Sequence, residues 1–183
     1  MKNILFVCTG NSARSIIAES IINNKYSYKF KAYSAGSNPT GKINENIKLY
    51  LTKIKNFNLE NYSSKNFDIF LNKKFNIDHV ITVCNSANKE VCPVWPNNNQ
   101  IIHWDIDDPV SKFQNSNEKQ INEIISETYD IISKKINIRK LNNYMKNKTI
   151  EINVNLNLGK YFHTVYGNDL TFEYLKINAD YRC

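Results

Sequence analysis

The chain has 183 residues, of which 42% are hydrophobic and 22% are charged, and its formal net charge is +7. This hydrophobic fraction is enough to bury a core, so the composition excludes wholesale disorder and predicts one folded domain. Only three of the 24 basic residues are arginine, and the lysines are scattered singly or in pairs. The basic excess therefore indicates a solvated surface, and we expect no nucleic-acid partner.

Targeting signals are also missing from the sequence pattern. No stretch approaches the roughly 18 apolar residues of a membrane helix. The apolar run at residues 4–7 is too short for the core of a signal peptide. We therefore expect a cytoplasmic protein without a membrane partner. In that reducing compartment the four cysteines are better suited to catalysis, redox exchange or metal binding than to structural disulfides.

The first half of the chain alternates strand and helix patterns. Residues 3–8 form an apolar run typical of a buried strand, and apolar residues at helical spacing then predict a helix that ends near residue 24. A second strand is predicted at 28–34, followed by a loop rich in Gly, Ser and Pro. Helical spacing returns between residues 43 and 54, and a shorter helix is expected after residue 64.

The second half continues this alternation. Strands are predicted at 77–84 and 100–104, and a long closing helix is predicted at 121–136. Strands that alternate with helices indicate an α/β fold, here a three-layer αβα arrangement around a four-stranded parallel sheet. We expect one domain over residues 1–140, followed by a carboxyl-terminal segment, 141–183, of unknown structure.

The segment between the first strand and the first helix carries the most informative motif, a cysteine and an arginine separated by five residues. Backbone N–H groups of a tight loop and a helix amino terminus can bind a tetrahedral oxyanion, and Arg14 adds a planar fork for two oxygens. The same positive field favours the thiolate of Cys8, which is the nucleophilic form. The predicted oxyanion-binding residues are Thr9, Gly10, Asn11, Ser12, Ala13 and Arg14, with Asn11 and Ser15 as loop support and Gly10 as the residue that permits the turn.

A simpler interpretation is that Cys8 is a small core residue and Arg14 a surface charge. The flanking strand, the Gly-Asn turn and the amphipathic helix favour the oxyanion site. With these neighbours the motif resembles that of the low-molecular-weight tyrosine phosphatase superfamily, which includes thioredoxin-coupled arsenate reductases. The resemblance covers about residues 1–140, and it implies a phosphotyrosine phosphatase I-like fold with a phosphate-binding loop after the first strand. Ala13 is a departure, because some relatives have a further cysteine there.

The resemblance assigns a general acid to an Asp-Pro pair late in the chain. Here Asp107, Asp108 and Pro109 follow the predicted fourth strand, and Asp108 directly precedes the proline. The residue before a proline is held extended, which could direct its carboxylate towards the loop. Asp108 is therefore the expected acid. Phosphotyrosine enzymes commonly have tyrosines after this pair, whereas Val110 and Ser111 in this chain favour a small inorganic substrate.

Two further cysteines, Cys84 and Cys92, resemble the thiol relay of the arsenate reductase branch. The resemblance implies that Cys8 attacks arsenate, Cys84 attacks Cys8, and Cys92 passes the disulfide to thioredoxin. It implies arsenate as substrate, thioredoxin as partner, and neither cofactor nor metal. Two segments, 33–39 and 63–70, are also similar to segments of these families.

Several alternatives stay open from the sequence. Cys84 and Cys92 could be inert core thiols, or zinc ligands with His79 or His103, although the spacing lacks a zinc knuckle. The chain could instead hydrolyse phosphate monoesters through a Cys8 phosphoenzyme, or bind oxyanions as a sensor without catalysis. Glutathione with glutaredoxin could replace thioredoxin, and Cys183 has no predicted role.

Overall fold

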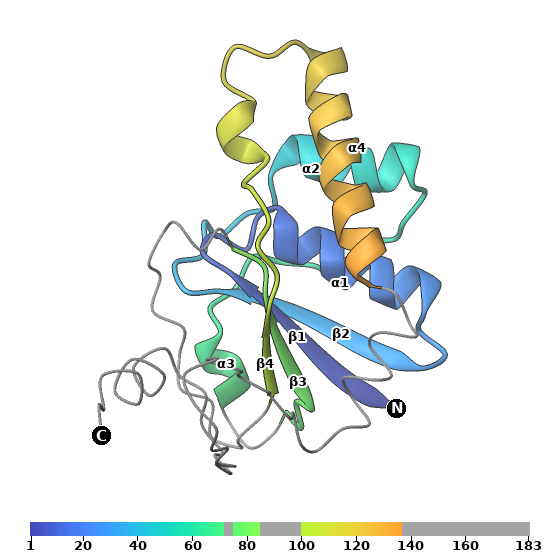
Figure 1. Cartoon of the computed structure of the whole chain (residues 1–183), viewed down its shortest axis with the longest axis vertical. Helices are drawn as coiled ribbons and strands as arrows, with labels where there is room; N and C mark the ends of the chain where they lie inside the picture. Colours follow the sequence, from blue (N-terminus) through green and yellow to red (C-terminus); the bar gives the residue numbers. More distant parts are fainter. Residues whose placement is uncertain (72–74, 85–99, 137–183) are drawn as a thin grey trace, which may run out of the picture. The chain divides into compact units, whose positions relative to one another are not determined.

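A computed structural model describes residues 1–71, 75–84 and 100–136, which all belong to a compact unit, Met1–Lys146. The described residues form one sheet of four parallel strands in the order β2-β1-β3-β4 (Figure 1). The strands are β1 (Lys2–Cys8), β2 (Phe30–Gly36), β3 (His79–Thr82) and β4 (Gln100–His103). The predicted α/β fold with a four-stranded parallel sheet is confirmed.

The described helices follow the predicted alternation. They are α1 (Arg14–Lys25), α2 (Glu45–Leu49), which continues as a π-helical turn (Tyr50–Ile54), α3 (Asp68–Leu71), a 3-10 turn (Val110–Lys112) and α4 (Glu118–Lys135). A capping box between Asn117 and Gln120 begins α4. None of these helices is long and apolar enough to cross a membrane, among the residues that the structure describes.

The strand predicted at 77–84 is shorter in the structure, where β3 covers only His79–Thr82. Ile77 and Val83 are nevertheless buried, with exposed fractions of 5% and 0%. An apolar run indicates which residues are buried, but it does not indicate which residues pair with a neighbouring strand. The prediction was therefore correct about the strand and wrong about its ends.

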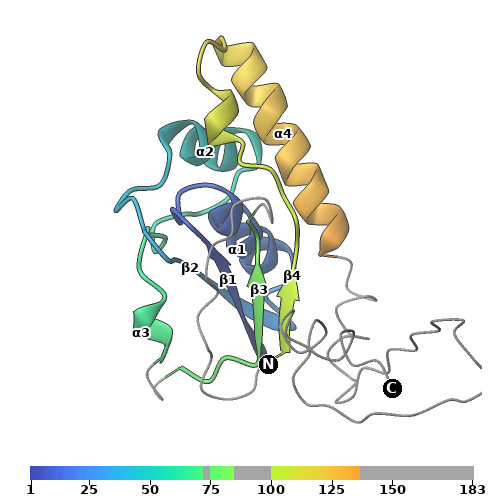
Figure 2. The same cartoon turned by 60° about the vertical axis from the view of Figure 1, so that its left-hand side comes forward.

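The two faces of the sheet pack against different helices. Ile4 and Phe6 of β1 belong to a core cluster that contains residues of α1 and α4. Leu5 and Val7 point to the other face and pack in a second cluster with Phe70 of α3. Figure 2 shows α3 on the opposite side of the sheet from α1 and α4. This alternation gives the three layers that the sequence predicts.

The position of β1 in the sheet determines where a ligand can bind. The chain leaves β1 for β2 on one side and later returns to β3 on the other side, so the strand order reverses beside β1. In open parallel sheets, ligands bind at the carboxyl ends of the strands where this reversal occurs. Cys8 is the last residue of β1 and lies at this point.

Candidate active site

The loop that follows β1 is held from outside through its carbonyl groups. Backbone hydrogen bonds of 2.9–3.1 Å join Ser37 N to Cys8 O, Asn38 N to Thr9 O, Thr40 N to Gly10 O and Asn44 N to Ser12 O. The C=O and N–H groups of a trans peptide point in opposite directions, so the N–H groups of residues 9, 10, 11 and 13 turn towards the inside of the loop. This arrangement of inward N–H groups suits an anion.

Asn11 provides the unusual backbone conformation of the loop. Its φ is +45°, in the left-handed region that Asn tolerates better than most residues. Gly10, which the sequence suggests as the residue permitting the turn, does not have a positive φ. A Cβ atom at Gly10 would lie 3.3 Å from Thr40 Cγ2, which is close but leaves room for adjustment. Backbone freedom is therefore needed at Asn11 more than at Gly10.

The Cys8 thiol lies at the base of the loop and is 4% exposed. It is a free thiol whose Sγ accepts the Asn11 backbone N–H at 3.2 Å. The Ser15 hydroxyl is 3.0 Å from the same sulfur. Two polar groups, the Asn11 N–H and the Ser15 hydroxyl, thus contact this sulfur.

The Asn11 side chain connects the loop to the sheet. Its Nδ2 donates to Ser15 Oγ and to Ser34 Oγ of β2, both at 2.9 Å, and its Oδ1 accepts the Lys65 backbone N–H at 2.8 Å. Ser34 Oγ in turn donates to Glu19 Oε2 of α1 at 2.5 Å. The amide of Asn11 thus has both hydrogens and its oxygen engaged, which fixes the loop on three sides.

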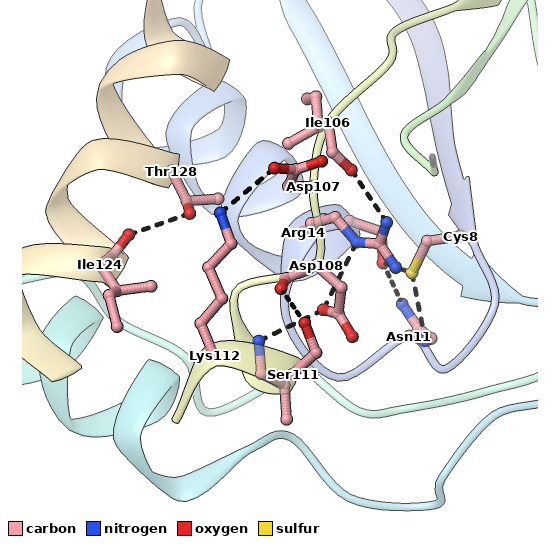
Figure 3. Close-up of polar contacts among 12 residues, drawn as sticks. Cys8, Asn11, Arg14, Ile106, Asp107, Asp108, Ser111, Lys112, Ile124 and Thr128 are labelled. Atoms are coloured by element: carbon pink, nitrogen blue, oxygen red, sulfur yellow. Dashed lines mark hydrogen bonds and ion pairs between the residues drawn. The ribbon is translucent and has the colours of Figure 1, made fainter. Parts of the chain in front are cut away.

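Arg14, the first residue of α1, lies beside this loop and is 8% exposed (Figure 3). Its Nη1 donates to the Ile106 carbonyl at 3.0 Å, and its Nε is 3.7 Å from Asp108 Oδ1. These contacts hold the guanidinium between the loop after β1 and the segment after β4. The helix α1 begins without a side-chain cap at Ala13, so its amino terminus adds a positive end at the same place.

The two neighbouring aspartates point in different directions. Asp108 faces Arg14, and its Oδ1 accepts the Val110 N–H at 3.4 Å (Figure 3). Asp107 instead pairs with Lys112 at 3.2 Å, and this pair is largely exposed. The structure therefore brings Asp108, and not Asp107, to the Cys8 loop.

Of the two further predicted cysteines, Cys84 is among the described residues and Cys92 is not. Cys84 comes directly after Val83, whose N–H donates to Val7 O at 2.7 Å, so Cys84 follows β3 at the level of the loop after Cys8. Cys84 is half-buried, and the chain bends there. Cys92 lies outside the described residues, as does the predicted boundary at residue 140.

Gly36 at the end of β2 allows the loop to lie close against the sheet. A Cβ atom there would be 2.4 Å from Thr9 O and 3.0 Å from Asn11 Cβ. A backbone oxygen cannot move aside as a side chain can, so only glycine fits.

Several contributions to the site do not appear among the predicted site residues: Ser34, Gly36, Glu19, the Lys65 N–H and the Ile106 carbonyl. Ser34 and Gly36 lie in the segment 33–39, whose similarity to the phosphatases was the available signal. Glu19 had a weaker signal, since it is an acid between two apolar pairs, Ile17-Ala18 and, one residue further on, Ile21-Ile22. A backbone carbonyl has no sequence signal. Within the described ranges, no three His, Cys, Asp or Glu side chains are grouped as a metal site.

Comparison with known proteins places these features in a family. Residues 3–151 match the family described as low molecular weight phosphotyrosine protein phosphatase. An arsenate reductase from Bacillus cereus is 38% identical over 111 residues, covering 61% of this chain and 79% of the relative. An arsenate reductase structure from Archaeoglobus fulgidus is 27% identical, with a TM-score of 0.54, and the match covers 72% of this chain and 96% of that one.

A phosphatase structure is similar in fold as well. The low molecular weight protein tyrosine phosphatase from T. tengcongensis has a TM-score of 0.56 at 22% identity, covering 74% of this chain and 98% of that chain. Arsenate reductases and phosphatases thus share this fold. The chain belongs to the low molecular weight phosphotyrosine protein phosphatase family, within the superfamily that includes arsenate reductases.

Proposed function

We propose that this chain reduces arsenate to arsenite by a thiol relay that begins at Cys8. The observation that carries the proposal is the Cys8 sulfur at the base of a loop whose carbonyls are tied outward. Arg14 lies beside this loop and contacts Asp108. The sequence similarity to arsenate reductases, 38% for the B. cereus protein, favours arsenate over a phosphate ester.

In the first step the loop binds arsenate, with its oxygens held by backbone N–H groups and by Arg14. The Cys8 thiolate attacks arsenic and forms a sulfur–arsenic bond. One arsenate oxygen leaves as water after Asp108 donates a proton to it. The contact with Arg14 orients the Asp108 carboxyl towards this oxygen. Arsenic remains in its pentavalent state in the adduct.

The second step transfers two electrons. The Cys84 thiolate attacks Cys8 Sγ, the sulfur–arsenic bond breaks, and its electron pair stays on arsenic, which leaves as arsenite. The products are trivalent arsenic and a Cys8–Cys84 disulfide. The place of Cys84 directly after β3, the neighbour of β1, supports this pairing.

The third step regenerates Cys8. Cys92 attacks Cys84 Sγ, which releases the Cys8 thiolate and leaves a Cys84–Cys92 disulfide. Thioredoxin then reduces this disulfide by its own dithiol. Site residues, relay order and reductant are proposed from the sequence motifs and the family resemblance.

A coupled assay tests the proposal. The full chain is mixed with thioredoxin, thioredoxin reductase and NADPH, and NADPH oxidation is followed after arsenate is added. A parallel reaction contains glutathione and glutaredoxin, and another measures hydrolysis of p-nitrophenyl phosphate. We expect arsenate-dependent oxidation with thioredoxin. Rapid ester hydrolysis without arsenate-dependent oxidation under either reductant would instead assign the chain to the phosphatases.

A further inference from the structure

Glu19 is a buried acid that the proposed mechanism does not use. It lies on α1, is 6% exposed, and accepts the Ser34 hydroxyl. Glu19 makes no ion pair within the part of the chain that the structure describes. Burial raises the pKa of Glu19 from 4.5 to about 7, so its charge changes in the neutral range.

A chain of hydrogen bonds connects Glu19 to the Cys8 sulfur through Ser34, Asn11 and Ser15. The Lys65 N–H fixes the oxygen of the Asn11 amide, so its nitrogen faces Ser15 and Ser34 and donates to both hydroxyls. Each hydroxyl must then direct its own hydrogen elsewhere. Ser15 Oγ shares a hydrogen bond with Cys8 Sγ at 3.0 Å, in which either atom could be the donor, and Ser34 Oγ donates to Glu19 Oε2. Asn11 thus connects the Cys8 thiol, through Ser15, with the Glu19 carboxyl, through Ser34.

Few other charged or titratable groups face this carboxyl among the described residues. The positive charge of Lys65 lowers the pKa of Glu19, and the Lys65 ammonium is itself held by the Ser63 carbonyl at 3.0 Å. The pKa of Tyr62 is raised to about 12, mainly by burial and also by the negative charge of Glu19. Glu19 therefore has one cation near it, and that cation lies at the protein surface.

We propose that Glu19 is a proton-accepting partner of the oxyanion loop: when a dianion binds beside Cys8, the Glu19 carboxylate takes up a proton from solvent. The inference rests on the proposed function, because it requires that the loop bind a tetrahedral dianion. A dianion adds two negative charges at the other end of the Asn11 bridge, and a nearby like charge favours the neutral form of a buried acid. The neutral carboxyl keeps a carbonyl oxygen that accepts from Ser34, so the loop geometry is retained.

The consequence is a defined pH dependence of anion binding. As pH rises through about 7, Glu19 becomes charged in the empty protein, and its repulsion weakens dianion binding. The affinity for the dianion should fall by about tenfold if the bound dianion shifts the protonation equilibrium of Glu19 by about one pH unit. Glu19→Gln keeps an acceptor for Ser34 and carries no charge, so its affinity should not fall in this range.

Sulfate is the probe for the test, because it remains a dianion throughout the neutral range and is not reduced by thiols. Sulfate binding is measured by calorimetry in buffers of different ionisation enthalpy, which gives the protons taken up per anion bound. The chain with its native sequence should take up about half a proton at pH 7. The uptake by Glu19→Gln should be smaller by this amount, whereas Cys8→Ser should retain the share that belongs to Glu19.

Lys65→Gln provides a second, independent variant. Removing this surface cation should move the pH of maximal uptake upward, because the cation now lowers the pKa of Glu19. Unchanged uptake in Glu19→Gln, loss of uptake in Cys8→Ser, or an unmoved maximum in Lys65→Gln would each overturn the assignment to Glu19. Absence of sulfate binding by the native chain would instead contradict the oxyanion site itself.

Discussion

Single residues decide the chemistry of this site more than the overall charge does. The net charge of +7 comes mostly from scattered lysines, whereas Arg14 is buried beside Cys8. The Cys8 loop was predictable from residue types, since cysteine, arginine and a Gly-Asn turn have few common uses together. Glu19 was not predictable as a partner, because its role depends on a contact with Ser34 on another element.

Arg14→Lys should weaken arsenate reduction although it preserves the charge. Lysine cannot bind two oxygens with a planar guanidinium. Losing one charge-assisted hydrogen bond of about 2 to 3 kcal/mol should lower kcat/KM by roughly 30- to 160-fold. The coupled assay measures this, with Lys48→Arg as a control on an exposed helix position. Full activity in Arg14→Lys would show that arsenate reduction does not need the Arg14 guanidinium to bind two oxygens.

Asp108→Asn and Asp107→Asn form a matched pair. We expect Asp108→Asn to reduce kcat by at least about a hundredfold, the usual minimum contribution of a general acid. Asp107→Asn removes an exposed pair with Lys112, and such a pair is worth about 1 kcal/mol or less. Single-turnover measurements of adduct formation separate the two. A larger loss in Asp107→Asn would reverse the assignment.

Glu19→Gln should also change how stability depends on pH. The pKa of Glu19 is about 7 in the folded chain and 4.5 by its ordinary value, so the folded state binds its proton more tightly. The tighter proton binding contributes about 3 kcal/mol to the free energy of unfolding. This contribution is fully present below pH 4.5 and is lost as the pH rises towards 7. The native chain should therefore lose stability against Glu19→Gln between these pH values in urea titrations. If the free energies of unfolding of the two proteins changed in parallel with pH, burial would not raise the pKa of Glu19.

At the scale of elements, the site depends on how β2 and the segment after it hold the loop after β1. Apolar periodicity located the described strands and helices, because it reports which residues are buried. It did not locate the ends of β3 or the π-helical turn at Tyr50–Ile54, which depend on pairing and on backbone bonds. The outward carbonyl bonds of the loop likewise could not be inferred, since backbone partners leave no trace in residue types.

Gly36→Ala tests this contact between β2 and the loop. Its Cβ would lie 2.4 Å from Thr9 O, so the loop must move, at a cost of about 1 to 3 kcal/mol in stability. Arsenate reduction should fall further than this loss of stability explains, because the N–H groups lose their alignment. Gly41→Ala is the control: its φ of +77° is strained for alanine, but its Cβ would meet nothing within 4 Å. Equal activity of both variants would exclude a special role for Gly36.

At the scale of the molecule, sheet order places the two chemically important strand ends side by side. The order β2-β1-β3-β4 makes β1 and β3 neighbours. Cys8, the last residue of β1, and Cys84, two residues after β3, therefore lie at the carboxyl ends of adjacent strands. Alternating patterns alone do not determine strand order, so the periodicity could not predict that β1 and β3 are neighbours.

The central claim is that Cys8 attacks arsenate and Cys84 releases arsenite, and one measurement tests it most directly. Prereduced protein is mixed with arsenate without any reductant, and arsenite is quantified after rapid quenching. The native chain and Cys92→Ser should each release a single equivalent of arsenite and lose two free thiols, whereas Cys8→Ser and Cys84→Ser should release none. Arsenite from Cys8→Ser, or none from the native chain, would contradict the account.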